Sequence, residues 1–148
     1  KPGNIIDVTG KIIGTHDGII NFTIGQRRGI KIAGKNPMYV IKINSEKNSI
    51  TVGSKKNLLI KKMILRDLNI LGQKEEFYSE VFAKVRSTGK LLRTKVKIID
   101  QKAEVEVLED ETGISPGQAC VFYKKDEFGD KLLGGGWIDK TCNKNLST

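Results

Sequence analysis

The chain has 148 residues, 38% of them hydrophobic and 29% charged, a balance typical of a globular protein and not of a disordered one. Its formal net charge of +9 is uneven: residues 1–66 carry 13 basic and three acidic side chains, and residues 67–148 carry 13 basic and 14 acidic ones. A basic first half favours a polyanionic partner, nucleic acid ahead of a membrane surface, and no apolar run approaches the roughly 20 residues that span a bilayer.

Short strands are predicted throughout the first half. We expect one hairpin from Asn4–Val8 and Lys11–Ile13 around the turn Thr9-Gly10, and a second from Pro37–Ile43 and Ser49–Gly53 around a polar loop. The segment Thr23–Arg28 is the exception, where we expect one helical turn with Asn21 or Thr23 as its N-cap.

Longer strands with clean alternation follow. Phe77–Arg86 is predicted as a strand with Val81, Ala83 and Val85 on one face. Thr94–Ile99 and Lys102–Val107 are expected to close on the two-residue turn Asp100-Gln101. In that register Val96 faces Val105 and Ile98 faces Ala103, whereas Lys95 opposes Glu106 and Lys97 opposes Glu104. These two lysines are therefore explained by strand pairing rather than by a nucleic-acid patch.

The last predicted hairpin joins Gln118–Lys124 to Lys131–Asp139 and contains three consecutive glycines, Gly134-Gly135-Gly136. Glycine weakens a strand, so we expect either a close backbone approach or a bend there, as the closure of a small barrel requires. The fold class is therefore predicted to be mainly all-β. We expect a β-rich domain with one short helix at residues 1–62 and an antiparallel β-barrel at residues 63–148.

Few residues carry recognisable catalytic chemistry. Neither a Walker nor a dinucleotide glycine loop occurs, and no cysteine or histidine has zinc-ligand spacing. Cys120 lies in an apolar run and is expected to be buried, whereas Cys142 is expected to be exposed in a polar tail; two cysteines fit a reducing cytoplasm. His16, the only histidine, is expected in a turn or bonded to the backbone. From the residues alone we expect a binding module.

A basic motif closes the run from His16 to Gly29. The side chains of Arg27 and Arg28 point in different directions on a strand and on a helix alike, so at least one guanidinium reaches solvent or an anionic partner. The planar set of N–H donors on a guanidinium suits phosphate. On spacing alone, a polar turn with two solvated arginines explains the motif equally well. We include both arginines, and the lysines between residues 55 and 62, as candidate RNA contacts on the ground of charge.

Several motifs together resemble the C-terminal half of the bacterial tRNA-specific 2-thiouridylases. The segment Lys1–Asp7 is similar to the entry into the central domain of that family, and His-x-Gly followed by Thr-Ile-Gly-Gln-Arg-Arg-Gly is similar to its signature. Pro37-Met38-Tyr39-Val40 resembles the strand that follows. Ser115-Pro116-Gly117-Gln118 and Leu133-Gly134-Gly135-Gly136 resemble the barrel motifs.

The resemblance implies a cytoplasmic transferase that 2-thiolates the wobble uridine of tRNA anticodons, with ATP and a persulfide sulfur donor as cofactors of the parent. It implies that the ATP motif and both catalytic cysteines belong to an N-terminal domain that these 148 residues lack. We therefore expect this chain to bind tRNA, to hold no cofactor, catalytic residue or metal, and to be inactive alone. Since Lys1 is not an initiator methionine, we also expect a fragment of a longer protein.

Two tRNA contacts are carried over by the resemblance. The barrel of the family contacts tRNA through an Arg-Tyr-type dipeptide, which corresponds here to Arg86-Ser87, so that serine replaces the aromatic side chain. The glutamine of Pro-Gly-Gln corresponds to Gln118.

Alternatives remain open at this point. The chain fits a translation-factor-like RNA-binding barrel, or a domain that docks a sulfur-carrier protein or a cysteine desulfurase. Thiol chemistry through Cys120 and Cys142 is a third alternative. Nothing in the sequence demands more than a monomer.

Overall fold

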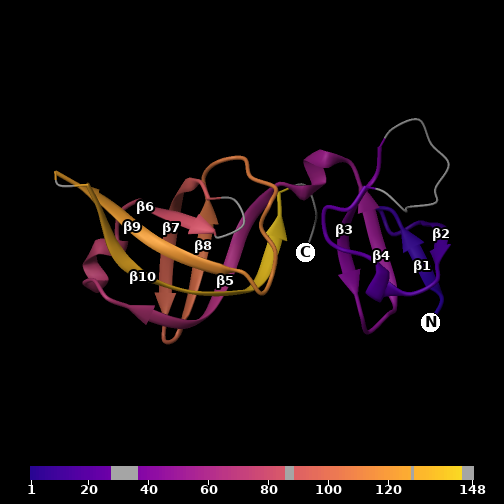
Figure 1. Ribbon diagram of the computed structural model, residues 1–148, viewed down its shortest axis with the longest axis horizontal. Helices are drawn as coiled ribbons and strands as arrows, with labels where there is room; N and C mark the ends of the chain where they lie inside the picture. Colours follow the sequence, from indigo (N-terminus) through magenta and orange to yellow (C-terminus); the bar gives the residue numbers. More distant parts are fainter. Residues whose placement is uncertain (28–36, 86–88, 128, 145–148) are drawn as a thin grey trace. The chain divides into compact units, whose positions relative to one another are not determined.

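The computed structural model describes residues 1–27, 37–85, 89–127 and 129–144. Within these ranges the chain forms strands β1 to β10 and three single-turn 3-10 helices, η1 to η3 (Figure 1). The mainly all-β class is therefore confirmed. Contacts divide the chain into two compact units, Lys1–Leu59 and Ile60–Lys144.

The first unit is built on a four-stranded sheet with the strand order β2-β1-β4-β3. Its strands are β1 (Gly3–Ile6), β2 (Ile12–His16), β3 (Tyr39–Asn44) and β4 (Ser49–Gly53). The β1–β2 and β3–β4 hairpins are both antiparallel and confirm the two predicted ones, while β1 and β4 pair in parallel. Four fully buried aliphatic residues form the core: Ile5, Val40, Ile50 and Val52.

The helical turn expected at Thr23–Arg28 is wrong. The 3-10 helix of this segment, η1, lies earlier, at Ile19–Asn21, and Gly18 takes the N-cap position in place of Asn21 or Thr23. Residues Thr23 to Gln26 instead form a tight turn in which Gly25 has a φ of +88°. Because a left-handed residue ends a right-handed helix, that glycine rules out the expected one. The second 3-10 helix of the unit, η2, spans Lys55–Leu58.

The second unit is a closed barrel with the strand order β10-β5-β8-β7-β6-β9 (Figure 1). Every neighbouring pair is antiparallel. The strands are β5 (Ile60–Ile70), β6 (Val81–Val85), β7 (Leu91–Ile99), β8 (Lys102–Val107), β9 (Ala119–Asp126) and β10 (Gly129–Asn143).

Three predicted features of the barrel can be compared directly. The β7–β8 hairpin has the predicted register, with Lys95 opposite Glu106 and Lys97 opposite Glu104. The strand predicted from Phe77 begins only at Val81, because Phe77 ends the 3-10 helix η3 (Lys74–Phe77) and is buried. The last hairpin is present, and β10 runs four residues beyond the predicted end.

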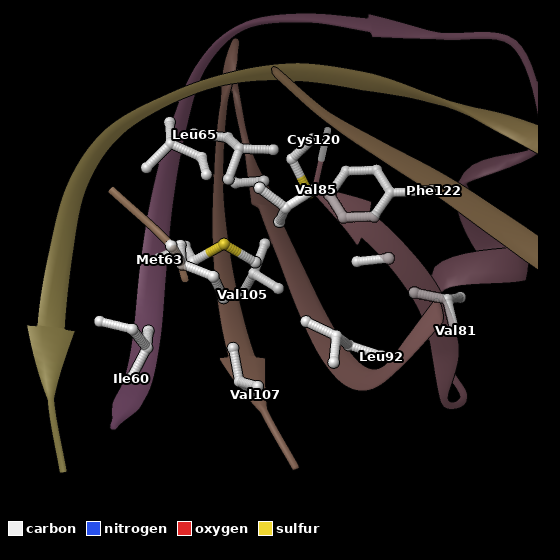
Figure 2. Packing of buried hydrophobic residues seen from close by; sticks show 14 of the residues in the cluster. Ile60, Met63, Leu65, Val81, Val85, Leu92, Val105, Val107, Cys120 and Phe122 are labelled. Carbon is white, nitrogen blue, oxygen red and sulfur yellow. The ribbon is translucent and has the colours of Figure 1, made fainter. Parts of the chain in front are cut away.

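The barrel interior is filled by side chains of all six strands, and Figure 2 labels residues from β5 to β9. Val81, Ala83 and Val85 are fully buried, as the alternation of β6 predicts. Phe122 of β9 meets the ring of Phe77 edge to face, with 5.6 Å between ring centroids.

The glycines of β10 are required by close backbone approach, as predicted. A Cβ at Gly134, where φ is +138°, would collide with the carbonyl oxygen of Asn69. A Cβ at Gly135 would lie 2.5 Å from the carbonyl oxygen of Cys120. The β10 register shifts between Leu132 and Gly134 and again between Gly135 and Trp137. These bulges bend β10 so that it pairs with both β5 and β9 and closes the barrel.

Candidate functional site

The Thr-Ile-Gly-Gln part of the basic motif is a turn pinned to β3. Thr23 and Gln26 bond reciprocally: Gln26 N donates to Thr23 O at 3.0 Å, and Thr23 N donates to Gln26 Oε1 at 2.9 Å. Gly25 N donates to Val40 O at 2.8 Å, and Val40 N donates to Gln26 O at 2.9 Å. These hydrogen bonds close the turn and join it to Val40 of β3, directly before Arg27.

His16 has a structural role within the same segment. Its Nε2 lies 2.9 Å from the carbonyl oxygen of Asn48, and its buried Nδ1 has no partner among the described residues. Because only a donor can bond a carbonyl, the ring carries its proton on Nε2. Asn48 Nδ2 in turn donates to the carbonyls of Lys1 and Pro2, at 3.1 and 2.7 Å. The expectation of a backbone-bonded imidazole is confirmed.

The first unit has many cations and few carboxylates. Arg27 is exposed, and the six ion pairs between described residues all lie in the barrel unit. The described cations of the first unit that show no ion pair include Lys11, Arg27, Lys42, Lys47 and Lys55. Their charge is therefore available to an anionic partner. Arg28 lies outside the described residues.

The lysines between residues 55 and 62 are divided between the two units. Lys55 and Lys56 are exposed on η2 of the first unit, whereas Lys62 belongs to β5 of the barrel. Lys62 Nζ lies 2.6 Å from Glu104 Oε1. This hydrogen-bonded contact raises the pKa of Lys62 and lowers the pKa of Glu104. Lys62 is thus an ion-pair partner within the barrel.

Gln118 precedes β9 and is half-buried. Its Oε1 accepts a hydrogen bond from Ser115 N at 3.1 Å, while its backbone carbonyl accepts one from Ile138 N at 2.8 Å. Gly117, with φ of +91°, donates its N–H to Ile138 O at 2.8 Å. The Pro-Gly-Gln motif is therefore a turn tied to β10, and it orients the Gln118 amide group.

The other carried-over candidates, Arg86 and Ser87, lie outside the described residues. The last described residue of β6 is Val85, which is buried and pairs with Cys120. Its neighbour Lys84 points outward, is exposed, and shows no ion pair with a described residue.

The cysteines differ in their surroundings. Cys120 is fully buried in the barrel, as predicted, and burial raises the pKa of its thiol to about 12. Cys142 is not in an exposed tail: it lies half-buried within β10, opposite Lys62, because that strand extends to Asn143. No group of three metal-ligating side chains occurs among the described residues. In the same part of the chain, no helix is long and apolar enough to cross a membrane.

Sequence reasoning missed an exposed aromatic residue, Trp137, which is 47% exposed on the outer face of β10. It faces Ala119 of β9 and Arg66 of β5. Its neighbour Ile138 is buried, so strand alternation applied to β10 contains the signal.

Each of the two units matches a known protein family. Residues 1–54 match the family described as the tRNA methyl transferase PRC-barrel domain, and residues 60–138, more than half of the chain, match the aminomethyltransferase beta-barrel domain.

Similar curated proteins carry the name tRNA-specific 2-thiouridylase MnmA. The one from Wolbachia pipientis subsp. Culex pipiens is 46% identical over 140 residues, which are 93% of this chain and 37% of that protein. Those of Maricaulis maris and Rhodopseudomonas palustris strain CGA009 are 41% and 40% identical, over 95% and 99% of this chain and 35% and 38% of theirs. The chain thus spans a little over a third of the length of these relatives. It belongs to the tRNA-specific 2-thiouridylase family, as a C-terminal portion with a PRC-barrel domain and a β-barrel domain.

Proposed function

We propose that this chain is the tRNA-binding portion of a tRNA-uridine 2-sulfurtransferase that acts on the wobble uridine of anticodons. Its role is to position the tRNA, while ATP activation and persulfide transfer are carried out by residues outside these 148. Arg27 and Arg28 contact phosphates from the first unit, and Arg86, Ser87 and Gln118 contact tRNA from the barrel unit. The chain acts in the cytoplasm as a monomer.

The observation that carries the proposal is the contrast in charge along the chain: residues 1–66 carry 13 basic and three acidic side chains, whereas residues 67–148 carry 13 basic and 14 acidic ones. Five described cations of the barrel unit pair with carboxylates at 2.6 to 3.8 Å, and none of these ion pairs lies in the first unit. In the first unit the exposed Arg27 follows a turn with four hydrogen bonds, two of which join it to Val40 of β3. An exposed guanidinium suits a phosphate backbone, and such contacts set register without reading sequence. The names of the relatives, tRNA-specific 2-thiouridylases, support tRNA as the polyanion that we propose.

The test is a salt titration of binding between the chain and unmodified tRNA. Each phosphate neutralised contributes about −0.9 to the slope of log K against log salt. The double variant Arg27→Ala with Arg28→Ala should weaken binding and reduce the slope by at most about 2. The matched control Lys95→Gln with Lys97→Gln removes two charges that face glutamates across β7 and β8 and should leave the slope unchanged.

A duplex DNA of equal charge is the second control. Preferential binding of tRNA supports docking to its shape. Equal binding of both polymers, or a folded arginine variant with the wild-type slope, would contradict the proposal. Binding of an acidic sulfur-carrier protein that tRNA cannot displace would identify a protein-docking domain instead.

A further inference from the structure

The outer face of the barrel carries a groove that no described contact fills. Its volume is about 320 Å³, and its floor is the backbone of Gly134, Gly135 and Gly136. Trp137, Leu132 and Leu71 stand around it, and they are 47%, 46% and 61% exposed. This size is at the lower end of small-ligand sites, about 300–1,000 Å³, and suits a single flat ring system.

The groove follows from the register of three strands. On the outer face of the barrel, Leu132 pairs with Tyr123, Gly135 with Val121 and Trp137 with Ala119. Each pair of β10 and β9 residues forms one row across the two strands, and the three rows follow one another along β10. Glycine leaves the middle row without a side chain, and the row becomes a slot with Leu132 on one side and Trp137 on the other. Barrel closure requires the glycines, but it does not require an exposed indole, that of Trp137, beside them.

Polar groups lie at one edge of the slot. Asp67 and Asn69 of β5 both line it, and Asn69 pairs directly with Gly135. Arg66 Nη1 lies 2.6 Å from Asp67 Oδ2 and balances its charge, and Arg66 Nε lies 3.8 Å from Asp139, the neighbouring carboxylate. Carboxylate and amide oxygens accept hydrogen bonds from the exocyclic amino groups of nucleobases, and an aromatic face stacks on any base.

A free cation lies at the opposite edge. Lys84 of β6 pairs with Val121, which pairs with Gly135, so all three belong to one outward row. At the usual spacing between strands, Lys84 lies about 10 Å from Gly135. Its flexible side chain can therefore approach a phosphate attached through ribose to a base in the slot.

We propose that this groove binds one unpaired nucleobase of an RNA strand, stacked on Trp137, with Asp67 and Asn69 at its polar edge and Lys84 near its phosphate. The inference rests on the proposed RNA-binding function and adds a subsite to it. Bases in a duplex are stacked on one another, so the groove selects single-stranded segments.

Trp137 is the only tryptophan in the 148 residues, so its fluorescence reports the groove directly. The experiment titrates the chain with a single-stranded RNA hexamer of mixed sequence, and with the same hexamer annealed to its complement. We expect the single strand to quench the emission and the duplex to leave it nearly unchanged. Anisotropy of a labelled hexamer gives the affinity independently.

Variants separate stacking from structure. Trp137→Leu should weaken hexamer binding about 5- to 100-fold, the range of base–aromatic stacking. Trp137→Phe should restore much of the affinity, which a merely misfolded barrel would not. The control Tyr78→Leu removes another exposed aromatic ring of the barrel unit, 74% exposed and outside the groove lining, and should change the affinity less than about 2-fold.

The outcomes distinguish this inference from the proposed function. An absence of quenching, or equal affinities of Trp137→Leu and wild type, overturns the subsite, while salt-dependent tRNA binding through Arg27 would still stand. Quenching by a basic, leucine-rich peptide and not by the hexamer overturns it in favour of a protein-docking groove. A chain that binds neither hexamer nor tRNA fails both proposals.

Discussion

At the scale of single residues, the two thiols of the barrel unit should react very differently. Cys120 is fully buried and its thiol has a pKa of about 12, raised by desolvation. The thiolate is the reactive form, so at pH 8 Cys120 is almost entirely protonated as well as inaccessible. Cys142 lies at the surface of β10 and is only half-buried. We expect a disulfide reagent to modify one thiol rapidly in the native chain and the second only after unfolding.

The matched variants for this prediction are Cys142→Ser and Cys120→Ser. The first should abolish the rapid native reaction, and the second should leave it intact. Rapid modification of both thiols in the folded chain would contradict the burial of Cys120 and reopen the alternative of thiol chemistry.

At the scale of elements, the 3-10 helix η3 is held to the barrel by two lysines of the last hairpin. Lys124 Nζ donates to Glu76 O at 2.9 Å and to Ser79 Oγ at 2.8 Å, and Lys131 Nζ lies 2.9 Å from Glu76 Oε2. Glu76 Oε1 accepts from Gln73 N at 2.8 Å. This backbone hydrogen bond, followed by the one from Lys131, lowers the pKa of Glu76 below its ordinary value of 4.5.

A carboxyl whose folded pKa is lowered stabilises the native state above its unfolded pKa, and loses that contribution as the pH falls through the folded value. Glu76→Gln should therefore lower the urea midpoint at pH 7 and have a smaller effect near pH 3, as measured by the fluorescence of Trp137. Glu75→Gln, on the same helix, is the control and should change neither midpoint. An equal effect of Glu76→Gln at both pH values would show that its charge has no part in holding η3.

Elements also show what local sequence can predict. The register of β7 and β8 followed from alternating Val, Lys and Glu around a two-residue turn, because a slip by one residue would move lysines into the core. The turn at Thr23 could not be derived in the same way: it depends on a hydrogen bond from Gly25 N to Val40 O and one from Val40 N to Gln26 O, and Val40 is distant in sequence. The alternation also placed Val81, Ala83 and Val85 inside, but it did not show that Phe77 belongs to a 3-10 turn packed on Phe122.

At the scale of the whole molecule, closure of the barrel depends on pairs that no local pattern specifies. β10 pairs with β5 across some seventy residues, with three register shifts along that edge and one more along its edge with β9. The glycines indicated that a close approach occurs, but not which carbonyls they meet. For the same reason the groove beside Trp137, which needs β5, β9 and β10 together, was not foreseen. Arg27 and Gln118 are described, but whether they bind tRNA stays a prediction.

Each of the two hydrophobic cores consists of residues from one unit only, so we expect each unit to unfold separately. The first unit has four fully buried aliphatic residues in its core, far fewer than the barrel, and a domain of about 60 residues is marginally stable. Ile50→Ala removes one of the four and should cost about 2–5 kcal/mol, enough to unfold a marginal unit. We expect it to move the amide NMR signals of residues 1–59 to random-coil positions while the urea transition of Trp137 fluorescence in the barrel unit stays in place.

Leu92→Ala is the matched control, because Leu92 is equally buried in the barrel. It should move the Trp137 transition to lower urea and leave the signals of the first unit native in the absence of denaturant. Should Ile50→Ala shift the Trp137 transition as far as Leu92→Ala does, the two cores unfold as one cooperative structure. Separate transitions would instead mean that each unit folds independently of the other. The salt dependence of Arg27 and the fluorescence of Trp137 could then be measured in one chain as independent readouts of the two proposed contacts.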